Sequence, residues 1–271
     1  MADSRSTKAP NPMQINPPYG FQEIVPLEKK HKVALPKSRT LPAVFRNMNP
    51  MPVSFVEFVL VARDYPLVFI SGDGAKTFMP MAVLGLEQQQ NLFVLGDNTW
   101  DRRVYLPAYV RRYPFCMTRV SVDGQERAER VACVEKSALS EKGDALFNGK
   151  GDATPEWEAL QKLLFEYEAD LARTDEFCKV LALLNLFEPF AMQATPAGGG
   201  EPLALTGMFR VSEQKLAELD PARLKEMTAN GILARIFAHL MSLDNFRRLL
   251  DRRAAYAKKS GGDKPDKSKL N

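Results

Sequence analysis

Histidine and cysteine are scarce in this chain of 271 residues, which contains two histidines and three cysteines. His31 and His239 lie far apart, and Cys116, Cys133 and Cys178 form no C-x-x-C pair. Zinc sites are usually built from closely spaced pairs of such ligands. We therefore expect no metal site and no cofactor. We also expect three reduced, buried thiols, as in a protein from a reducing compartment.

Long apolar runs are also absent. Runs such as Val180–Leu184 are far shorter than the ~20 residues needed to cross a bilayer. The first residues are polar and rich in proline, and they lack the apolar stretch of a secretory signal. We therefore expect no transmembrane segment, no export signal and a cytoplasmic location.

A broad basic surface is missing as well, although the formal net charge is +4. Residues 258–271 contain five lysines against two aspartates, a net +3, and residues 1–18 contribute +1. Residues 19–257 are therefore formally neutral, which argues against nucleic-acid binding by the folded part. We expect residues 1–18 to be a disordered arm and residues 258–271 a basic disordered tail.

A motif of Arg, one spacer, Tyr-Pro and an apolar run occurs twice. It begins at Arg63 and again at Arg111, 48 residues later. Proline disfavours the helical conformation in the residue before it. Each Tyr-Pro is therefore predicted to end one element and to begin an extended one.

The N-terminal half shows mostly strand patterns. Ser54 and Glu57 have the spacing of a capping box, which predicts a helix to about Asp64. A buried strand should follow over Leu67–Ile70. Asp123-Gly124 predicts a hairpin, whose strands we place at 114–122 and 130–135.

The C-terminal half shows mostly helical patterns. Thr154 and Thr174 resemble N-caps, so we expect one helix from each, the second ending at Pro189. A strand over 203–211 should precede short helices and a last helix over 232–250. The overall prediction is an α+β fold, with an antiparallel or mixed sheet in the N-terminal half and a helical C-terminal half packed against it. The expected subdomains are residues 19–150 and 151–257.

Cations and aromatic rings are densest between Trp100 and Met117. Two adjacent arginines beside tyrosines are suited to bidentate binding of a carboxylate or phosphate. Alternatively, one arginine faces solvent while the other pairs with an acid such as Glu57 or Asp64, and the tyrosines pack in the core. The candidate ligand-binding residues are Trp100, Tyr109, Arg111, Arg112 and Tyr113, with Arg63 and Tyr65 from the first motif.

No catalytic constellation stands out. His31 lies among charged residues, as a solvated surface histidine does, and His239 lies on an apolar helix face, where a core histidine is common. Neither has a neighbouring acid and nucleophile in the sequence. We therefore assign no catalytic residue.

Several segments together resemble the bacterial SapC family. They are E-F-V-L-V-A-R-D-Y-P-L-V-F at 57–69, L-G-L at 84–86, N-L-F-V at 91–94, Y-L-P-A-Y-V-R-R-Y-P-F at 105–115, L-F-E-P at 186–189, L-T-G-M-F-R-V-S-E-Q-K-L at 205–216 and G-I-L-A-R-I-F-A-H-L-M-S-L at 231–243. The resemblance implies, through the family's name, an association with surface layers. It assigns no catalytic residue to any position of this chain.

These observations favour a non-catalytic binding, scaffold or accessory protein of the SapC type. Its expected partner is another protein, a second copy of itself or an anionic small ligand, and not a nucleic acid. The alternative is an accessory enzyme that acts on an anionic small molecule or peptide through the Arg/Tyr cluster.

Overall fold

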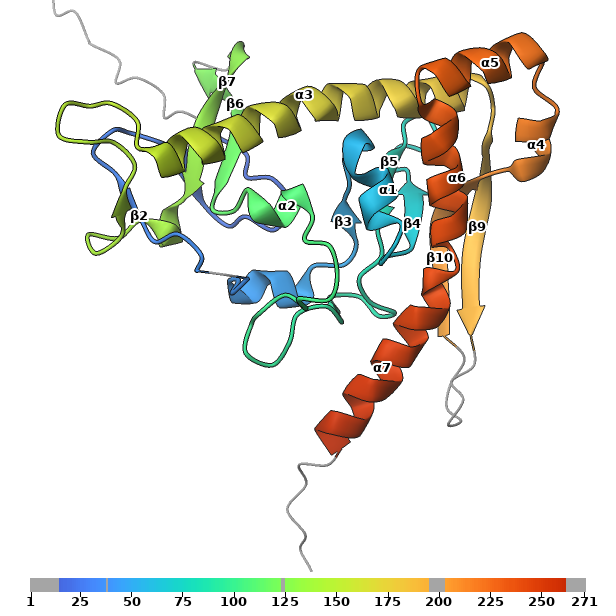
Figure 1. The fold of residues 1–271 in the computed structure, drawn as a ribbon, viewed down its shortest axis with the longest axis horizontal. Coiled ribbons are helices and arrows are strands. Elements are labelled where there is room, and N and C mark those ends of the chain that lie inside the picture. The colour runs from blue at the N-terminus through green and yellow to red at the C-terminus, as the bar shows by residue number, and fades with distance from the viewer. Residues whose placement is uncertain (1–14, 38, 123–124, 195–202, 262–271) are drawn as a thin grey trace, which may run out of the picture. The chain divides into compact units, whose positions relative to one another are not determined.

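The computed structural model describes residues 15–37, 39–122, 125–194 and 203–261 of the chain. The fold is α+β, as predicted (Figure 1). Nearly all of the expected arm at 1–18, most of the expected tail and the Asp123-Gly124 turn lie outside the described residues. No helix in the described ranges is both long and apolar enough to cross a bilayer.

Two compact units make up the described chain, and each unit combines two stretches of sequence. The first unit comes from Met1–Lys37 and Arg112–Phe165, and the second from Ser38–Arg111 and Glu166–Asn271. The subdomains expected at 19–150 and 151–257 stay a prediction.

The first unit is built on an antiparallel sheet of three strands in the order β1-β7-β6. A smaller sheet pairs β2 with β8. The bounds are β1 Ile24–Pro26, β2 Lys32–Val33, β6 Phe115–Val122, β7 Gln125–Glu135 and β8 Asp144–Ala145, with a 3-10 helix η3 at Lys136–Ala138. The antiparallel pairing of β6 with β7 confirms the predicted hairpin, but β7 begins at Gln125 and not at the predicted Arg130.

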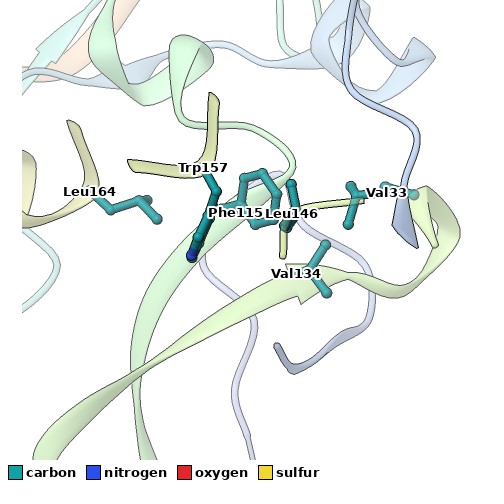
Figure 2. Packing of buried hydrophobic residues seen from close by; sticks show 7 residues of the cluster. Val33, Phe115, Val134, Leu146, Trp157 and Leu164 are labelled. Atoms are coloured by element: carbon teal, nitrogen blue, oxygen red, sulfur yellow. The ribbon is translucent and has the colours of Figure 1, made fainter. Parts of the chain in front are cut away.

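The core of the first unit joins strand and helix residues from distant parts of the sequence. The ring centroids of Phe115 and Trp157 are 5.0 Å apart, and Figure 2 shows the two side chains next to each other. The other members of this buried cluster are Val33, Val134, Ala138, Leu146 and Leu164. Trp157 comes from the first turn of helix α3, so burial of this ring fixes the start of that helix against the hairpin.

The second unit contains an antiparallel sheet of five strands in the order β3-β5-β4-β10-β9. The bounds are β3 Met51–Pro52, β4 Leu67–Ile70, β5 Met79–Ala82, β9 Phe187–Ala194 and β10 Leu203–Val211. The prediction of β4 as a buried strand is confirmed. The C-terminal half is therefore not purely helical, because its hairpin β9–β10 completes a sheet begun in the N-terminal half.

The predicted helix ending at Pro189 is wrong. Helix α3 ends at Leu183, and Pro189 lies within β9. β9 is an edge strand, and an edge strand tolerates proline because it need not donate a full ladder of hydrogen bonds. Sequence pattern alone did not distinguish this edge strand from a helix end.

Several of the remaining helices and 3-10 helices begin or end at residues other than those predicted from the sequence. Their bounds are η1 Ala43–Asn47, η2 Phe55–Glu57, α1 Phe58–Val61, α2 Ala108–Arg111, α3 Pro155–Leu183, α4 Glu213–Ala217, α5 Pro221–Ala229, α6 Ile232–Ser242 and α7 Asn245–Gly261. Thr154 caps α3 as predicted, since its Oγ1 accepts a hydrogen bond from the Trp157 amide at 3.3 Å. The predicted last helix is two helices, and α7 extends past residue 257, where we expected the tail to begin.

Thr174 does not start a second helix. α3 is continuous over 29 residues, and the Thr174 hydroxyl donates to the Asp170 carbonyl at 2.7 Å. A threonine inside a helix often makes this bond to the preceding turn, so its hydroxyl is used without ending the helix.

The ring packing predicts that Trp157→Ala will lower the free energy of unfolding by about 3–5 kcal/mol, because it empties a fully enclosed volume. The matched control is Phe165→Ala on the same helix, whose side chain is 54% exposed. We expect that change to cost less than about 0.5 kcal/mol in urea unfolding. Equal losses from the two variants would contradict the assignment of Trp157 to the core.

Candidate functional site

The structure does not gather all of the predicted site residues in one compact unit. Arg112 and Tyr113 belong to the first unit, and the second unit contains Arg63, Tyr65, Trp100, Tyr109 and Arg111. The two adjacent arginines, Arg111 and Arg112, thus belong to different units.

Arg112 and Tyr113 are buried within the first unit. The guanidinium carbon of Arg112 lies 5.5 Å from the ring centroid of Phe21, and that ring lies 5.4 Å from the ring of Tyr113. Burial raises the pKa of the Tyr113 hydroxyl, and the charge of Glu135 raises it further. Both side chains contribute to packing here.

Arg111 makes the ion pair that the sequence offered as the alternative to a ligand site. Its side chain is 41% exposed, and its Nη2 lies 3.6 Å from Oε1 of Glu57. The same nitrogen donates to the Tyr105 hydroxyl at 3.0 Å. The charge of Arg111 is thus already opposed by a carboxylate of the protein.

Glu57 is a buried hydrogen-bond acceptor and not half of a capping box. Its Oε1 accepts from the Tyr105 hydroxyl at 2.6 Å and from the Ala108 amide at 2.7 Å, at the start of α2. Ser54 donates its hydroxyl to Oε2 at 3.2 Å and makes no cap bond of its own. Burial, together with the neighbouring Glu57 carboxylate, raises the pKa of Tyr105. Glu57 therefore joins α1 to the loop before α2.

The first backbone amides of η2, just before α1, are capped by side chains of α3. Thr174 Oγ1 accepts from the Phe55 amide, and Asp170 Oδ2 accepts from the Val56 amide, both at 2.9 Å. Asp170 is buried. These acceptors satisfy amides that an N-cap residue would otherwise serve. The sequence around Phe55 and Val56 gives no local signal for these caps, because Asp170 and Thr174 lie more than a hundred residues away.

Tyr65 and Trp100 belong to the core of the second unit. The Trp100 indole nitrogen donates to the Tyr65 hydroxyl at 2.9 Å, and that hydroxyl donates to the Tyr105 carbonyl at 2.5 Å. Burial raises the pKa of Tyr65. Tyr109 is also buried, with its ring centroid 6.3 Å from that of Tyr167. These aromatic rings form internal structure and not the wall of an open site.

The first Tyr-Pro motif is the surface on which the junction of α6 and α7 packs. The Leu67 amide donates to Ser242 Oγ at 2.9 Å, and the Asn245 side-chain amide donates to the carbonyls of Ala62 and Tyr65. The chain changes from helix to strand here, which leaves backbone groups without regular partners. Polar residues of α6 and α7 supply those partners. The predicted role of Tyr65-Pro66 as an element boundary is confirmed.

His239 uses both ring nitrogens for structure. Its Nε2 accepts from the Val211 amide at 3.1 Å, so the proton lies on Nδ1, which donates to the Leu67 carbonyl at 3.0 Å. Burial lowers the pKa of His239 to about 4. A neutral imidazole with two backbone partners has no free nitrogen to act as a general base. His31 uses its Nδ1 to accept a hydrogen bond from the Glu28 amide at 3.1 Å.

The cysteines are buried, as expected. Burial raises the pKa of Cys133 to about 11 and that of Cys178 to about 12. Protonated thiols are poor nucleophiles. In the described part of the chain, no three His, Cys, Asp or Glu side chains gather as a metal site requires.

An open groove of about 550 Å³ in the second unit is lined by α1, α6 and the start of α7. We call it the α1–α6 groove. Its lining residues are Val59, Ala62, Arg63, Ala234, Phe237, Ala238, Met241, Asp244, Asn245 and Arg248. Val59 and Phe237 are each 49% exposed, and Met241 is 76% exposed. Arg63 is the predicted site residue that lines this groove.

The groove follows from the different burial of two faces of α6. One face carries Ile232, Ile236 and His239 and is buried, while Figure 1 shows the helix running beside β10. The other face carries Phe237 and Met241 and is open. The sequence signal for this open face is the pair Phe237 and Met241, which lie one turn apart on α6 and outside the stripe of Ile232, Ile236 and Leu240.

The hydrogen bonds of Glu57 predict that Glu57→Ala will lower the free energy of unfolding by about 3 kcal/mol, because it leaves buried donors unpaired. Arg111→Ala removes only a half-exposed cation and should cost less than about 1 kcal/mol. Urea unfolding of both variants measures the difference. If the arginine change costs as much as the glutamate change, the ion pair and not the hydrogen-bond network holds this region.

The low pKa of His239 predicts a loss of stability in acid. The unfolded chain takes up the proton near pH 6.5, whereas the folded chain resists it until about pH 4. The folded state is therefore favoured above pH 6.5, and this contribution, on the order of 3 kcal/mol, disappears as the pH falls from 6.5 to 4. Unfolding of wild type and His239→Gln should be compared at each pH, since carboxylates titrate equally in both. If the free energy of unfolding changes with pH in the same way in both proteins, His239 is not the source of the acid sensitivity.

Comparison with known proteins gives the chain's family. The SapC family matches residues 28–249, which span both units. Searches of curated proteins and of solved structures each found no match. The match covers most of the chain and includes both Tyr-Pro motifs and α6. The chain therefore belongs to the SapC family.

Proposed function

We propose that this SapC-family chain is a binding protein and not a catalyst, and that it binds a protein partner through the α1–α6 groove. The observation that carries the proposal is the groove itself, in which large apolar side chains of two helices are open to solvent. A contiguous apolar surface with a polar edge is typical of a site of protein interaction.

The shape of the groove supports a docked side chain or helix. Ala62, Ala234 and Ala238 lie among larger lining residues, so the surface has depressions beside projections. Such relief accommodates an anchor side chain better than a flat surface does. The volume, about 550 Å³, falls within the usual range of binding clefts.

The occupation of the ionisable groups supports binding over catalysis. His239 has both nitrogens bonded to backbone, and the pKa values of Cys133 and Cys178 are raised by burial. A cytoplasmic location and the surface-layer association implied by the family name belong to this proposal and need their own tests.

An anionic ligand at Arg111 is a second candidate. Its guanidinium is partly exposed and lies 5.7 Å from the ring centroid of Tyr105. We favour the groove because Glu57 already opposes the charge of Arg111. A panel of anions tested by thermal shift on wild type and Arg111→Ala separates the two candidates, since a stabilising anion that requires Arg111 would favour this second site.

Site-specific photo-crosslinking in the source cells tests the groove. A photoreactive residue at position 241 should give crosslinks to one defined segment of a partner protein. The matched control is position 183, because Leu183 is 86% exposed and does not line the groove. Crosslinks of equal yield and identity from both positions would overturn the proposal.

Charge placed in the groove should weaken the partner's binding without unfolding the protein. Met241→Asp is expected to change the Tm by less than about 2 °C, because the side chain is 76% exposed. The same change should lower affinity at least about tenfold, as burying an unpaired carboxylate at an interface is costly. Leu183→Asp is the control. Unchanged affinity in the Met241 variant would contradict the assignment.

A further inference from the structure

We infer that the occupant of the α1–α6 groove is an amphipathic helix of another protein, with carboxylate side chains beside its apolar stripe. The inference rests on the proposed function and adds the shape and charge of the partner.

The spacing of the lining residues on α6 points to a helix. Ala234, Phe237, Ala238 and Met241 occupy positions i, i+3, i+4 and i+7, which form one face of the helix. On the opposite side, Val59 and Ala62 of the α1 region line the same groove. Small residues between larger ones make holes for the knobs of a partner helix. Groove-binding helices place their anchors at this same spacing.

The length of the contact is short. The span from Ala234 to Met241 covers two helical turns, about 10 Å along the axis. A partner helix therefore needs two or three large apolar anchors on one face. An extended strand has no complementary edge here, because the groove is lined by helical residues and by the turns that follow α1 and α6.

The charge at the rim points to an acidic partner. Arg63 and Arg248 are both exposed, and the Arg248 guanidinium donates to the Arg63 carbonyl at 2.9 Å. Among the described residues, neither arginine forms an ion pair with a carboxylate. Asp244 is the acid among the lining residues, so two cations face one anion. Carboxylates of a partner would complement this excess and speed its approach.

The same charges disfavour a second copy of this chain. In a symmetric dimer, one surface meets itself. Two copies joined through the groove would bring together both sets of Arg63 and Arg248, with only the two Asp244 side chains between them. A partner of opposite charge avoids this repulsion.

The test uses a displayed library of helical peptides of about 18 residues, each with a fixed apolar stripe and randomised flanking positions. Peptides are selected on wild-type protein and counter-selected against Met241→Asp. We expect Asp and Glu to be enriched at the flanking positions. The selected peptides should bind Arg63→Gln/Arg248→Gln about tenfold more weakly, and less tightly as salt is raised.

Arg247→Gln is the matched control, because Arg247 is an exposed arginine of α7 outside the groove lining. Binders that require Met241 but show no acidic enrichment would overturn the inference and leave the proposed function standing. Failure to obtain any binder that requires Met241 would overturn both. Two further results would overturn the inference: sedimentation with phosphatidylcholine/phosphatidylglycerol vesicles that Met241→Asp abolishes, or a dimer in analytical ultracentrifugation that the same change dissociates.

Discussion

His239 holds α6 against the centre of the five-stranded sheet, and the position of the groove depends on it. One ring nitrogen serves the Val211 amide of β10 and the other the Leu67 carbonyl of β4, so a single side chain satisfies two strands. The Leu67 amide is taken by Ser242, three residues later on the same helix. Each of these backbone groups would be costly to leave unpaired in the core. The rotation of α6 about its axis is thereby set, and with it the face that remains open.

A helix fixed on one face makes a rigid platform on the other. Because the inner side of α6 is held by hydrogen bonds and by Ile232 and Ile236, the outer residues Phe237 and Met241 are presented on a preorganised backbone. Preorganisation reduces the entropy lost when a partner docks. The Tyr-Pro motif contributes to the same end, since its backbone carries the contacts of Ser242 and Asn245 and places Arg63 at the rim.

Buried acids join separate elements of the second unit by accepting hydrogen bonds from their backbone amides. Glu57 binds the start of α2, and Asp170 caps the turn before α1 from a distant helix. The arginine and tyrosine residues that look like a binding site in the sequence are largely used in the same way, as Arg111 pairs with Glu57 and Tyr65 with Trp100. Side chains whose types suggest ligand binding in the sequence thus serve mainly to hold the folded interior together.

The sequence by itself determined the α+β class, the β6–β7 hairpin, the strand after Tyr65-Pro66 and the N-cap at Thr154, because each depends on local pattern or local sterics. Resemblance in its motifs also identified the family. Only the tertiary structure decided that Pro189 lies in an edge strand and that Thr174 lies inside one helix.

Tertiary structure likewise decided which polar and aromatic residues stay available to a partner. Glu57 and Arg111 are paired, His239 is bonded on both sides, and Phe237 with Met241 remains uncovered. Whether a polar group already has a partner depends on residues more than a hundred positions away. Asp170 accepts from the Val56 amide, and the Leu67 carbonyl accepts from His239. Local periodicity contains no information about such partners, because they meet only when the chain has folded.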